Sequence, residues 1–542
     1  MPKWIFYQPT GGQFPLLQRK TQSPQYWQEL AVQPDDIEHL FKMLLESDHP
    51  QSTQSLVQSL IHHRLEREEV AIRTDLEGGT LYQPQGSYAI GERLIFPRFD
   101  YAMGTVTGQR GGHSPRYGEF AVVQVDFGAR DGLREFAAEF THPHQLNMSE
   151  GQGLADMEGG ASGTEICDQF KESITPRLHA ALKANPDFVH FRDSWLLKGL
   201  IAPVHGVHLN IAEAAIDIHN QPLPADVLLK HLDLPAALPA AIQEFSLNHT
   251  LDTDERFVNV GPRGQVLWYL RHMEPPALDQ VPRHLQLPDL TFDARRFHDD
   301  LRPLLYEIDD EATDPALVPA PASATDEMTI VLSYPHRESG TLPITARTES
   351  YFPRADNHHV RIALVDRQTG QRIPGWVISE HNYVVGLGEW YAKNQLVAGA
   401  YVTLHRTDSP LTVGVSYRPV RPKREWVRGA VVQGGRLSFQ NLRLMITCQY
   451  DDLMIVGEDD RAAVDALWEG PRDKKPLLNL LRQVAWELIK INPQGTVHAK
   501  TLYSAINVVR RCPPGPIFQE LSTNACFVPM GHGYWMYDAT KA

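Results

Sequence analysis

The stretch ERFVNVGPRGQVLWYL, residues 255–270, is the part of the sequence that best indicates the fold of the middle of the chain. Phe257 and Val260 precede a Gly-Pro-Arg-Gly turn, and Trp268 and Leu270 follow it at alternate positions. Glycine allows the positive φ that a tight turn needs, and alternating apolar residues are typical of strands. The stretch therefore predicts a strand, a turn and a second strand whose aromatic residue packs onto a neighbouring layer.

Three helical segments are expected before this hairpin. Residues 210–218 (NIAEAAIDI) open with an asparagine that suits a helix N-cap, and residues 222–232 (PLPADVLLKHL) begin at a proline. A third helix is expected over residues 239–251. Three short helices followed by a strand, a turn and a strand are the plan of a winged helix.

The C-terminus repeats this plan. Residues 477–491 (LLNLLRQVAWELIKI) are amphipathic, residues 496–506 (TVHAKTLYSAI) predict a further helix, and residues 526–538 read CFVPMGHGYWMYD. When the two copies are aligned on their glycine turns, Trp268 and Trp535 occupy equivalent strands.

Both copies resemble the HARE-type winged-helix domain, which is found in the delta subunit of some bacterial RNA polymerases and in chromatin and restriction proteins. The resemblance covers residues 205–275 and 474–540. It implies association with nucleic acid or with RNA polymerase, and no catalysis. A weaker third copy at residues 50–61 (PQSTQSLVQSLI) has paired helices and no convincing wing.

Two further segments have sequence patterns that are typical of β-strands. Short alternating runs broken by glycine and proline over residues 86–141 resemble an SH3-like or Tudor-like barrel. Residues 328–470 contain several alternating runs and one short helical stretch at 387–394, which predicts a pseudo-barrel or a sandwich. We therefore expect a multidomain α+β protein with two winged-helix modules, an SH3-like β-barrel and a β-rich pseudo-barrel or sandwich.

Two stretches are expected to be exposed linkers. Residues 147–163 are rich in glycine, serine and acidic residues, and residues 309–327 are acidic and rich in proline and alanine. The predicted division is an N-terminal helical segment (1–85), the barrel (86–146), a linker (147–163), the first winged-helix domain with flanking helices (164–280), a helix and acidic linker (281–327), the β-rich domain (328–470) and the second winged-helix domain (471–542).

Charge is unevenly distributed along the 542 residues, whose net charge is −15. An acidic protein of this kind does not coat nucleic acid along its whole surface. Residues 472–511, however, carry eight basic and two acidic side chains, whereas residues 209–274 carry nine acidic and four basic ones. We therefore expect a nucleic-acid contact in the C-terminal half, and a protein partner such as RNA polymerase for the acidic first winged helix.

The composition indicates a cytoplasmic protein with no membrane contact, and association with the nucleoid is compatible with it. No signal-peptide-like or membrane-spanning apolar run is present, and four cysteines without CxxC spacing do not form a disulfide framework.

The strongest candidate contact is the cluster RPVRPKREWVR at residues 418–428. Arginine forks suit phosphate oxygens, and an exposed tryptophan stacks on bases. The alternative is a solvated strand edge on which charges and proline block pairing with another sheet. The candidate residues in this cluster are Arg418, Arg421, Lys423, Arg424, Trp426 and Arg428.

The second winged helix supplies four more candidates near its second and third helices: His498, Lys500, Arg510 and Arg511. Side chains of these types contact the major groove in helix-turn-helix proteins. The alternative is that the following Cys-Pro-Pro-Gly run, at residues 512–515, ends the helix too early for insertion into a groove.

No catalytic residue, metal site or cofactor is expected. The pairs His142/His144 and His205/His208 lack further donors at zinc-like spacing, and the acidic pair Asp451–Asp452 suits a turn better than a magnesium site. Walker and nucleophile-elbow motifs are absent from the sequence. An enzyme whose site is assembled only by the fold stays open.

The sequence favours a non-catalytic architectural or regulatory protein that associates with DNA, with RNA as a second possible partner, or with transcription. The first alternative is a protein–protein scaffold within a nucleic-acid-processing or defence assembly. The second alternative is a metal-dependent nuclease.

Overall fold

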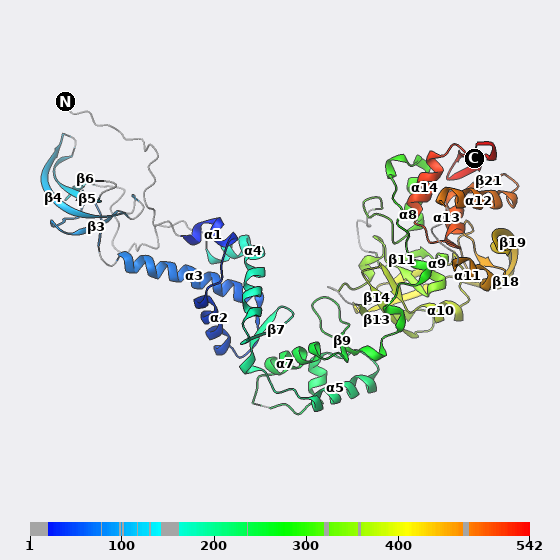
Figure 1. The fold of residues 1–542 in the computed structure, drawn as a ribbon, viewed down its shortest axis with the longest axis horizontal. Helices are drawn as coiled ribbons and strands as arrows, with labels where there is room; N and C mark the ends of the chain where they lie inside the picture. Colours follow the sequence, from blue (N-terminus) through cyan, green and yellow to red (C-terminus); the bar gives the residue numbers. More distant parts are fainter. Residues whose placement is uncertain are drawn as a thin grey trace. The chain divides into compact units, whose positions relative to one another are not determined.

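The computed structural model describes residues 20–76, 79–96, 99, 102–115, 117–128, 132–142, 162–235, 237–318, 325–355, 359–469 and 476–541. It is a mixed α/β structure (Figure 1). The chain divides into two compact units. Unit 1 comprises Met1–Val204 and Asp233–Thr250, and unit 2 comprises His205–Leu232 and Leu251–Ala542. None of the described helices combines the length and apolar character that crossing a membrane requires.

Unit 1 contains a helical layer closed by a small sheet. Its helices are α1 (Pro24–Gln28), α2 (Pro34–Glu46), α3 (Thr53–Leu76) and α4 (Gly163–Ala184). The strands β1 (Gln51–Ser52), β7 (Phe188–Phe191) and β8 (Ser194–Leu197) pair in the order β1-β8-β7. Trp27 and Trp195 are fully buried among leucines of these helices. From α2 onward the elements run helix, strand, helix, helix, strand, strand.

This arrangement includes the segment at residues 50–61 for which the sequence offered no convincing wing. The strand that pairs with β1 is β8 (Ser194–Leu197), which lies more than 130 residues further along the chain, and β7 (Phe188–Phe191) pairs with the other edge of β8. The fully buried Trp195 donates from its indole N–H to the hydroxyl of Thr53, at 3.0 Å. The helices before residue 85 therefore share a sheet and a hydrophobic core with residues 163–197.

A half-barrel sheet is inserted between α3 and α4. Its strands are β2 (Thr80–Leu81), β3 (Arg93–Phe96), β4 (Ala102–Ser114), β5 (Gly118–Asp126) and β6 (Leu133–Ala138), paired in sequence order. Backbone hydrogen bonds from Glu139 to Gly86 and from Phe140 to Pro84, at 3.0 and 2.9 Å, join the two ends of the sheet. Tyr82 and Phe96 stack in its core, with ring centroids 4.6 Å apart.

The expected linker at residues 147–163 falls mostly outside the described residues. Ser162 and Gly163 are described and belong to the start of α4. Ser162 and Glu165 form a capping box, in which each side chain bonds the backbone N–H of the other residue, so the helix has a defined first turn.

The first elements of unit 2 are α5 (Gly206–His219), α6 (Ala225–Leu229), β9 (Phe257–Asn259) and β10 (Trp268–Leu270). Helix α7 (Ala240–Thr253) is divided between the two units after Thr250. β10 pairs with β9 on one side and forms a bridge with Leu223 on the other. The predicted strand–turn–strand is thus present, with the buried Trp268 in its central strand.

A seven-stranded sheet forms the centre of unit 2. Its strands, in the order in which they pair, are β11 (Glu327–Val331), β16 (Tyr401–His405), β17 (Thr412–Tyr417), β13 (Val360–Asp366), β14 (Arg372–Ile378), β15 (Tyr383–Val385) and β12 (Thr341–Pro343). Only β13 and β17 of these described neighbours are parallel. Two helices, α9 (Tyr334–Ser339) and α10 (Gly388–Lys393), connect strands of this sheet. The sequence predicted only the second of them, at residues 387–394.

The chain then forms a long hairpin and a C-terminal module. The hairpin consists of β18 (Pro419–Gln433) and β19 (Arg436–Cys448), with β20 (Gly457–Glu458) beside β18. The module contains α11 (Arg461–Trp468), α12 (Leu477–Lys490), β21 (Thr496–His498), α13 (Ala499–Asn507), α14 (Pro514–Thr523), β22 (Phe527–Gly531) and β23 (Tyr534–Tyr537). Its strands pair in the order β21-β23-β22.

The prediction that residues 309–327 form an exposed linker is wrong for the first residues of this segment. Asp309 and Asp310 are buried, directly after α8 (Arg302–Ile308), and Val318 lies in a core that also contains Trp535 and Ala430. Because this one core joins α8, the hairpin and the C-terminal module, the predicted boundary at residue 470 does not separate two hydrophobic cores.

Candidate nucleic-acid interface

The candidate surface is built on the β18–β19 hairpin. Gly434 and Gly435 form its turn with φ of 56° and 73°, a left-handed geometry that suits glycine and closes a two-residue hairpin. Gln433 pairs with Arg436 next to the turn, and the antiparallel ladder continues back to Lys423 opposite Ile446. This register determines which side chains share a face, because directly paired residues project to the same side.

One face of the hairpin carries an exposed tryptophan among arginines. Trp426 pairs with Arg443, Arg424 with Met445, and Arg428 with Asn441. Trp426 is 69% exposed and Met445 is 51% exposed. We call this surface the Trp426 face, and it consists of Arg424, Trp426, Arg428, Asn441, Arg443 and Met445.

The hairpin is anchored to the body of unit 2 beneath this face and again closer to the turn. Val427, which alternates with the Trp426 face, is buried against Ile446 and Val456. Closer to the turn, Ala430 and Phe439 enter the core that includes the C-terminal module. The Trp426 face therefore lies on a supported sheet rather than on a free ribbon.

The electrostatic balance of the hairpin is opposite to that of the chain. Residues 418–448 contain seven arginine or lysine residues and one glutamate. That glutamate, Glu425, forms an ion pair with Lys423 and accepts a hydrogen bond from Tyr450 at 3.3 Å. Burial, helped by Glu425, raises the pKa of Tyr450 to about 12. Lys423 is thus partly neutralised within the hairpin.

The other residues of the predicted cluster differ in their surroundings. Arg418 is exposed and places its guanidinium 5.6 Å from the ring centroid of Tyr401. Arg421 is exposed and lies in the stretch where the ladder shifts register. Arg428 is half-buried and donates a hydrogen bond to the backbone carbonyl of Asp452. Within the described part of the chain, no ion pair occupies Arg421, Arg424 or Arg443.

Three of the four candidates in the C-terminal module are buried, which corrects the prediction made for them. Lys500 forms an ion pair with Asp451 and is 4% exposed, and Arg511 is 2% exposed and bonded to Asp310. His498 caps α13 by accepting a hydrogen bond from the Lys500 backbone, and burial, followed by the charge of Lys500, lowers its pKa. These groups face the interior, so they do not belong to the interface.

Arg510 is half-buried and is already engaged in interactions within the protein. It lies directly after α13, next to the buried Arg511, and not on the Trp426 face. The four candidate residues of the module are therefore all engaged in interactions within the protein.

The third helix of the C-terminal module, α14, is covered by an earlier part of the chain. The ring centroids of Phe297 and Phe518 are 6.0 Å apart. The backbone N–H of Asp293 donates to the Gln519 side chain at 2.7 Å, and that of His298 donates to Ser522 at 2.9 Å. Helix α14 is in contact with its own chain along its length, so it is not presented for insertion into a DNA groove.

The histidines of these two pairs that the structure describes contact groups of the protein itself. His205 and His208 stack with centroids 5.8 Å apart, and a ring nitrogen of His208 accepts from the backbone N–H of His205. His142 contacts the Tyr117 carbonyl at 3.1 Å, and His144 lies outside the described residues. Across the described ranges, no group of three or more His, Cys, Asp or Glu side chains is placed to hold a metal ion.

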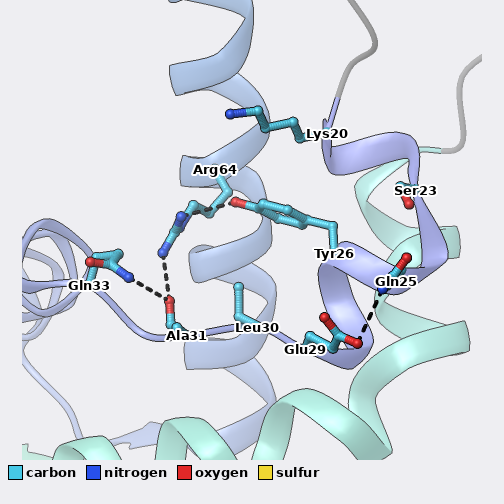
Figure 2. A pocket seen from close by; sticks show the side chains of 9 residues that line it. All are labelled: Lys20, Ser23, Gln25, Tyr26, Glu29, Leu30, Ala31, Gln33 and Arg64. Carbon is cyan, nitrogen blue, oxygen red and sulfur yellow. Dashed lines mark hydrogen bonds between the residues drawn. The ribbon is translucent and has the colours of Figure 1, made fainter.

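A cleft in unit 1 was not predicted by the sequence. Figure 2 shows its lining, in which the Arg64 guanidinium points towards Tyr26 and the Ala31 carbonyl. Arg64 donates to the Tyr26 hydroxyl at 3.0 Å, to Ala31 at 3.1 Å and to both oxygens of the fully buried Asp36. These internal bonds occupy the Arg64 guanidinium, and the exposed Lys20 is the other cation in the lining.

Arg443, Met445 and Asn441 were missed by the sequence-based prediction. The signal that identifies them is the Gln-Gly-Gly-Arg turn at residues 433–436. Counting outward from a two-residue turn places Arg443 opposite Trp426.

No family model, no curated protein and no solved structure matches the chain.

Proposed function

We propose that the protein is a non-catalytic nucleic-acid-binding protein whose contact surface is the Trp426 face. The observation that carries this proposal is the position of Trp426, which is 69% exposed and has Arg443 directly opposite it and Arg424 two residues away. Arginine forks bind phosphate oxygens through charge-assisted hydrogen bonds, and an exposed indole supplies a stacking surface.

The charge of this region supports a polyanionic partner. Residues 418–448 have seven basic residues and one acidic residue within a chain of net charge −15. The one carboxylate is already paired with Lys423. A strip of this kind attracts phosphate locally while the acidic remainder of the molecule repels it, so we propose a single confined contact rather than general coating.

We also propose that three segments are winged-helix modules, each beginning at one of the helices α2, α5 and α12. In each, the central strand of a small sheet is the last strand of the segment: β8, β10 and β23. The same order of elements in all three supports this reading, and the resemblance of residues 205–275 and 474–540 to HARE-type domains is part of the proposal. The half-barrel of β2–β6 is proposed to be SH3-like.

A second candidate function is a scaffold in which the modules contact proteins. The observation that favours it is the covering of α14 by residues 292–301, which leaves that helix engaged in packing. The excess of acidic residues over residues 209–274 disfavours phosphate and suits a protein partner, for which RNA polymerase is one candidate.

The test is salt-dependent binding of the full-length chain to labelled oligonucleotides. Each phosphate neutralised by arginine releases a counterion, so the slope of log affinity against log salt reports the number of contacts. The variant Arg424→Ala/Arg443→Ala is expected to bind more weakly and to flatten that slope by about 1.4 to 1.8.

The matched control is Lys230→Ala/Arg263→Ala, which removes two exposed cations from another part of unit 2. The control is expected to retain both the affinity and the slope. Equal losses in the two double variants would assign binding to net charge alone, and no binding at low salt would leave the scaffold function in its place.

A further inference from the structure

The chemistry of the Trp426 face specifies which form of nucleic acid it accepts. We infer that the ligand is single-stranded nucleic acid, with an unpaired base stacked on the Trp426 indole and the adjacent phosphates bound by Arg424, Arg428 and Arg443. This inference rests on the proposed function and adds the substrate class to it.

The register surrounds the indole with cations on three sides. Arg424 and Arg428 lie two residues before and after Trp426 on the same face of β18, and residues so spaced are about 6.6 Å apart along a strand. Arg443 is the direct cross-strand partner, and such partners have Cβ atoms about 4.5–5.5 Å apart. A flat apolar surface with charge at its margins matches a nucleotide, which has a flat base and a charged backbone.

The cations are available to a ligand to different degrees. Arg424 and Arg443 are exposed. Arg428 donates one hydrogen bond to the Asp452 carbonyl and has further guanidinium N–H donors with which to bind a phosphate. An isolated exposed aromatic residue is ordinary on protein surfaces. What distinguishes Trp426 is the set of arginines around it, since a ligand that covers the indole also meets their charge.

The support beneath the face argues against a duplex ligand. A paired base is covered by its neighbours in the stack, so stacking on tryptophan would require flipping or wedging, which costs a few kcal/mol per step. A wedge needs a protruding apolar residue, whereas Trp426 lies on a sheet whose opposite side is buried through Val427 and Ile446. An already unpaired base reaches this surface without that cost.

The experiment compares binding of the full-length protein to a single-stranded DNA, an RNA of the same sequence and the corresponding DNA duplex. The variants are Trp426→Leu and Trp426→Phe, with Trp486→Leu as the control. Trp486 is 48% exposed on α12 and is not part of the Trp426 face. Thermal unfolding of each variant verifies that the fold is retained.

Trp426→Leu is expected to weaken single-strand binding by roughly 5- to 150-fold, the range for loss of one base–aromatic stack. The salt slope should stay unchanged because no cation is removed. Trp426→Phe should recover most of the affinity, Trp486→Leu should resemble the unmodified protein, and the duplex should bind more weakly than either single strand. If the Trp426 variants change the binding of DNA and RNA to a similar extent, the protein recognises the bases and phosphates that both nucleic acids share.

Two results would overturn the inference. If the duplex binds as tightly as the single strands and Trp426→Leu has no effect, while Arg424→Ala/Arg443→Ala still weakens binding, the single-strand assignment fails and the proposed function stands. If none of the three nucleic acids binds at low salt, both fail together.

Discussion

Arg511 donates hydrogen bonds to both carboxylate oxygens of Asp310, which precedes it by 201 residues, at 2.8 and 2.7 Å. Both side chains are buried, and Tyr503 donates to the same carboxylate at 2.6 Å. Arg511 also bonds Glu311 at 2.7 Å, and Glu311 contacts His336 at 3.0 Å. The pair thereby attaches the chain that leaves α8 to the C-terminal module.

The first prediction concerns this buried pair. Asp310→Asn keeps the shape of the side chain but removes a charge that a buried guanidinium requires, so we expect a loss of about 3 kcal/mol in the free energy of unfolding. Urea unfolding followed by tryptophan fluorescence measures it. Glu349→Gln, which removes an exposed ion pair with Arg354 in the same unit, should cost less than about 1 kcal/mol. Equal costs for the two variants would contradict a structural role for the buried pair.

The second prediction concerns the pH dependence of stability. Burial raises the pKa of Asp309 to about 6, although Arg347 at 3.4 Å opposes this shift. The folded protein then binds a proton that the unfolded chain releases near pH 4, so the contribution of Asp309 to stability falls as pH rises from about 4 to about 6, by roughly 3 kcal/mol.

Asp309→Asn removes this contribution while keeping a residue that accepts the left-handed φ of 53° at this helix end. The variant should gain up to about 2–3 kcal/mol over the unmodified protein at pH 7 and much less at pH 4. Unfolding midpoints measured across this pH range check it. A gain that is independent of pH would show that the Asp309 carboxylate is not the cause.

The third prediction uses the one acidic side chain of the hairpin. Glu425 pairs with Lys423 and lies beside Trp426 in sequence. Glu425→Gln frees the lysine for phosphate and removes a repulsive charge, so we expect tighter binding and a salt slope steeper by about 0.7 to 0.9. Fluorescence anisotropy titrations at several salt concentrations measure both. Weaker binding by this variant would mean that Glu425 itself contacts the ligand.

Local patterns were sufficient for some of the fold. The strands around the glycine turn after Val260 follow from alternation and turn residues, and the basic cluster around Trp426 follows from local composition, all of which are properties of neighbouring positions. The pairing of β1 with β8 could not be predicted in this way, because the half-barrel separates Ser52 from its partner Ser194. Sequence periodicity carries no information about partners so distant.

Charged residues were the main source of error in the candidate site. Lys500 and Arg511 look like surface cations in the sequence, and each is buried against a carboxylate elsewhere in the chain. Asp310 was assigned to an exposed linker for the same reason. A buried ion pair becomes recognisable only when both members are placed, whereas Trp426 and its arginines share one hairpin and were mostly found together.

The central claim is that nucleic acid binds on the Trp426 face, and photo-cross-linking tests it most directly. A single-stranded oligonucleotide carrying 5-iodouracil is irradiated with the full-length protein, and the tryptic peptides are identified by mass spectrometry. Cleavage after Arg424 and Arg428 yields the peptide EWVR, residues 425–428. Our account predicts that this peptide carries the cross-link through Trp426. In Arg424→Ala/Arg443→Ala trypsin cleaves after Lys423 instead, and the resulting peptide of residues 424–428 should carry no adduct. Cross-links confined to the half-barrel or to the α5 region, with EWVR unmodified, would contradict it.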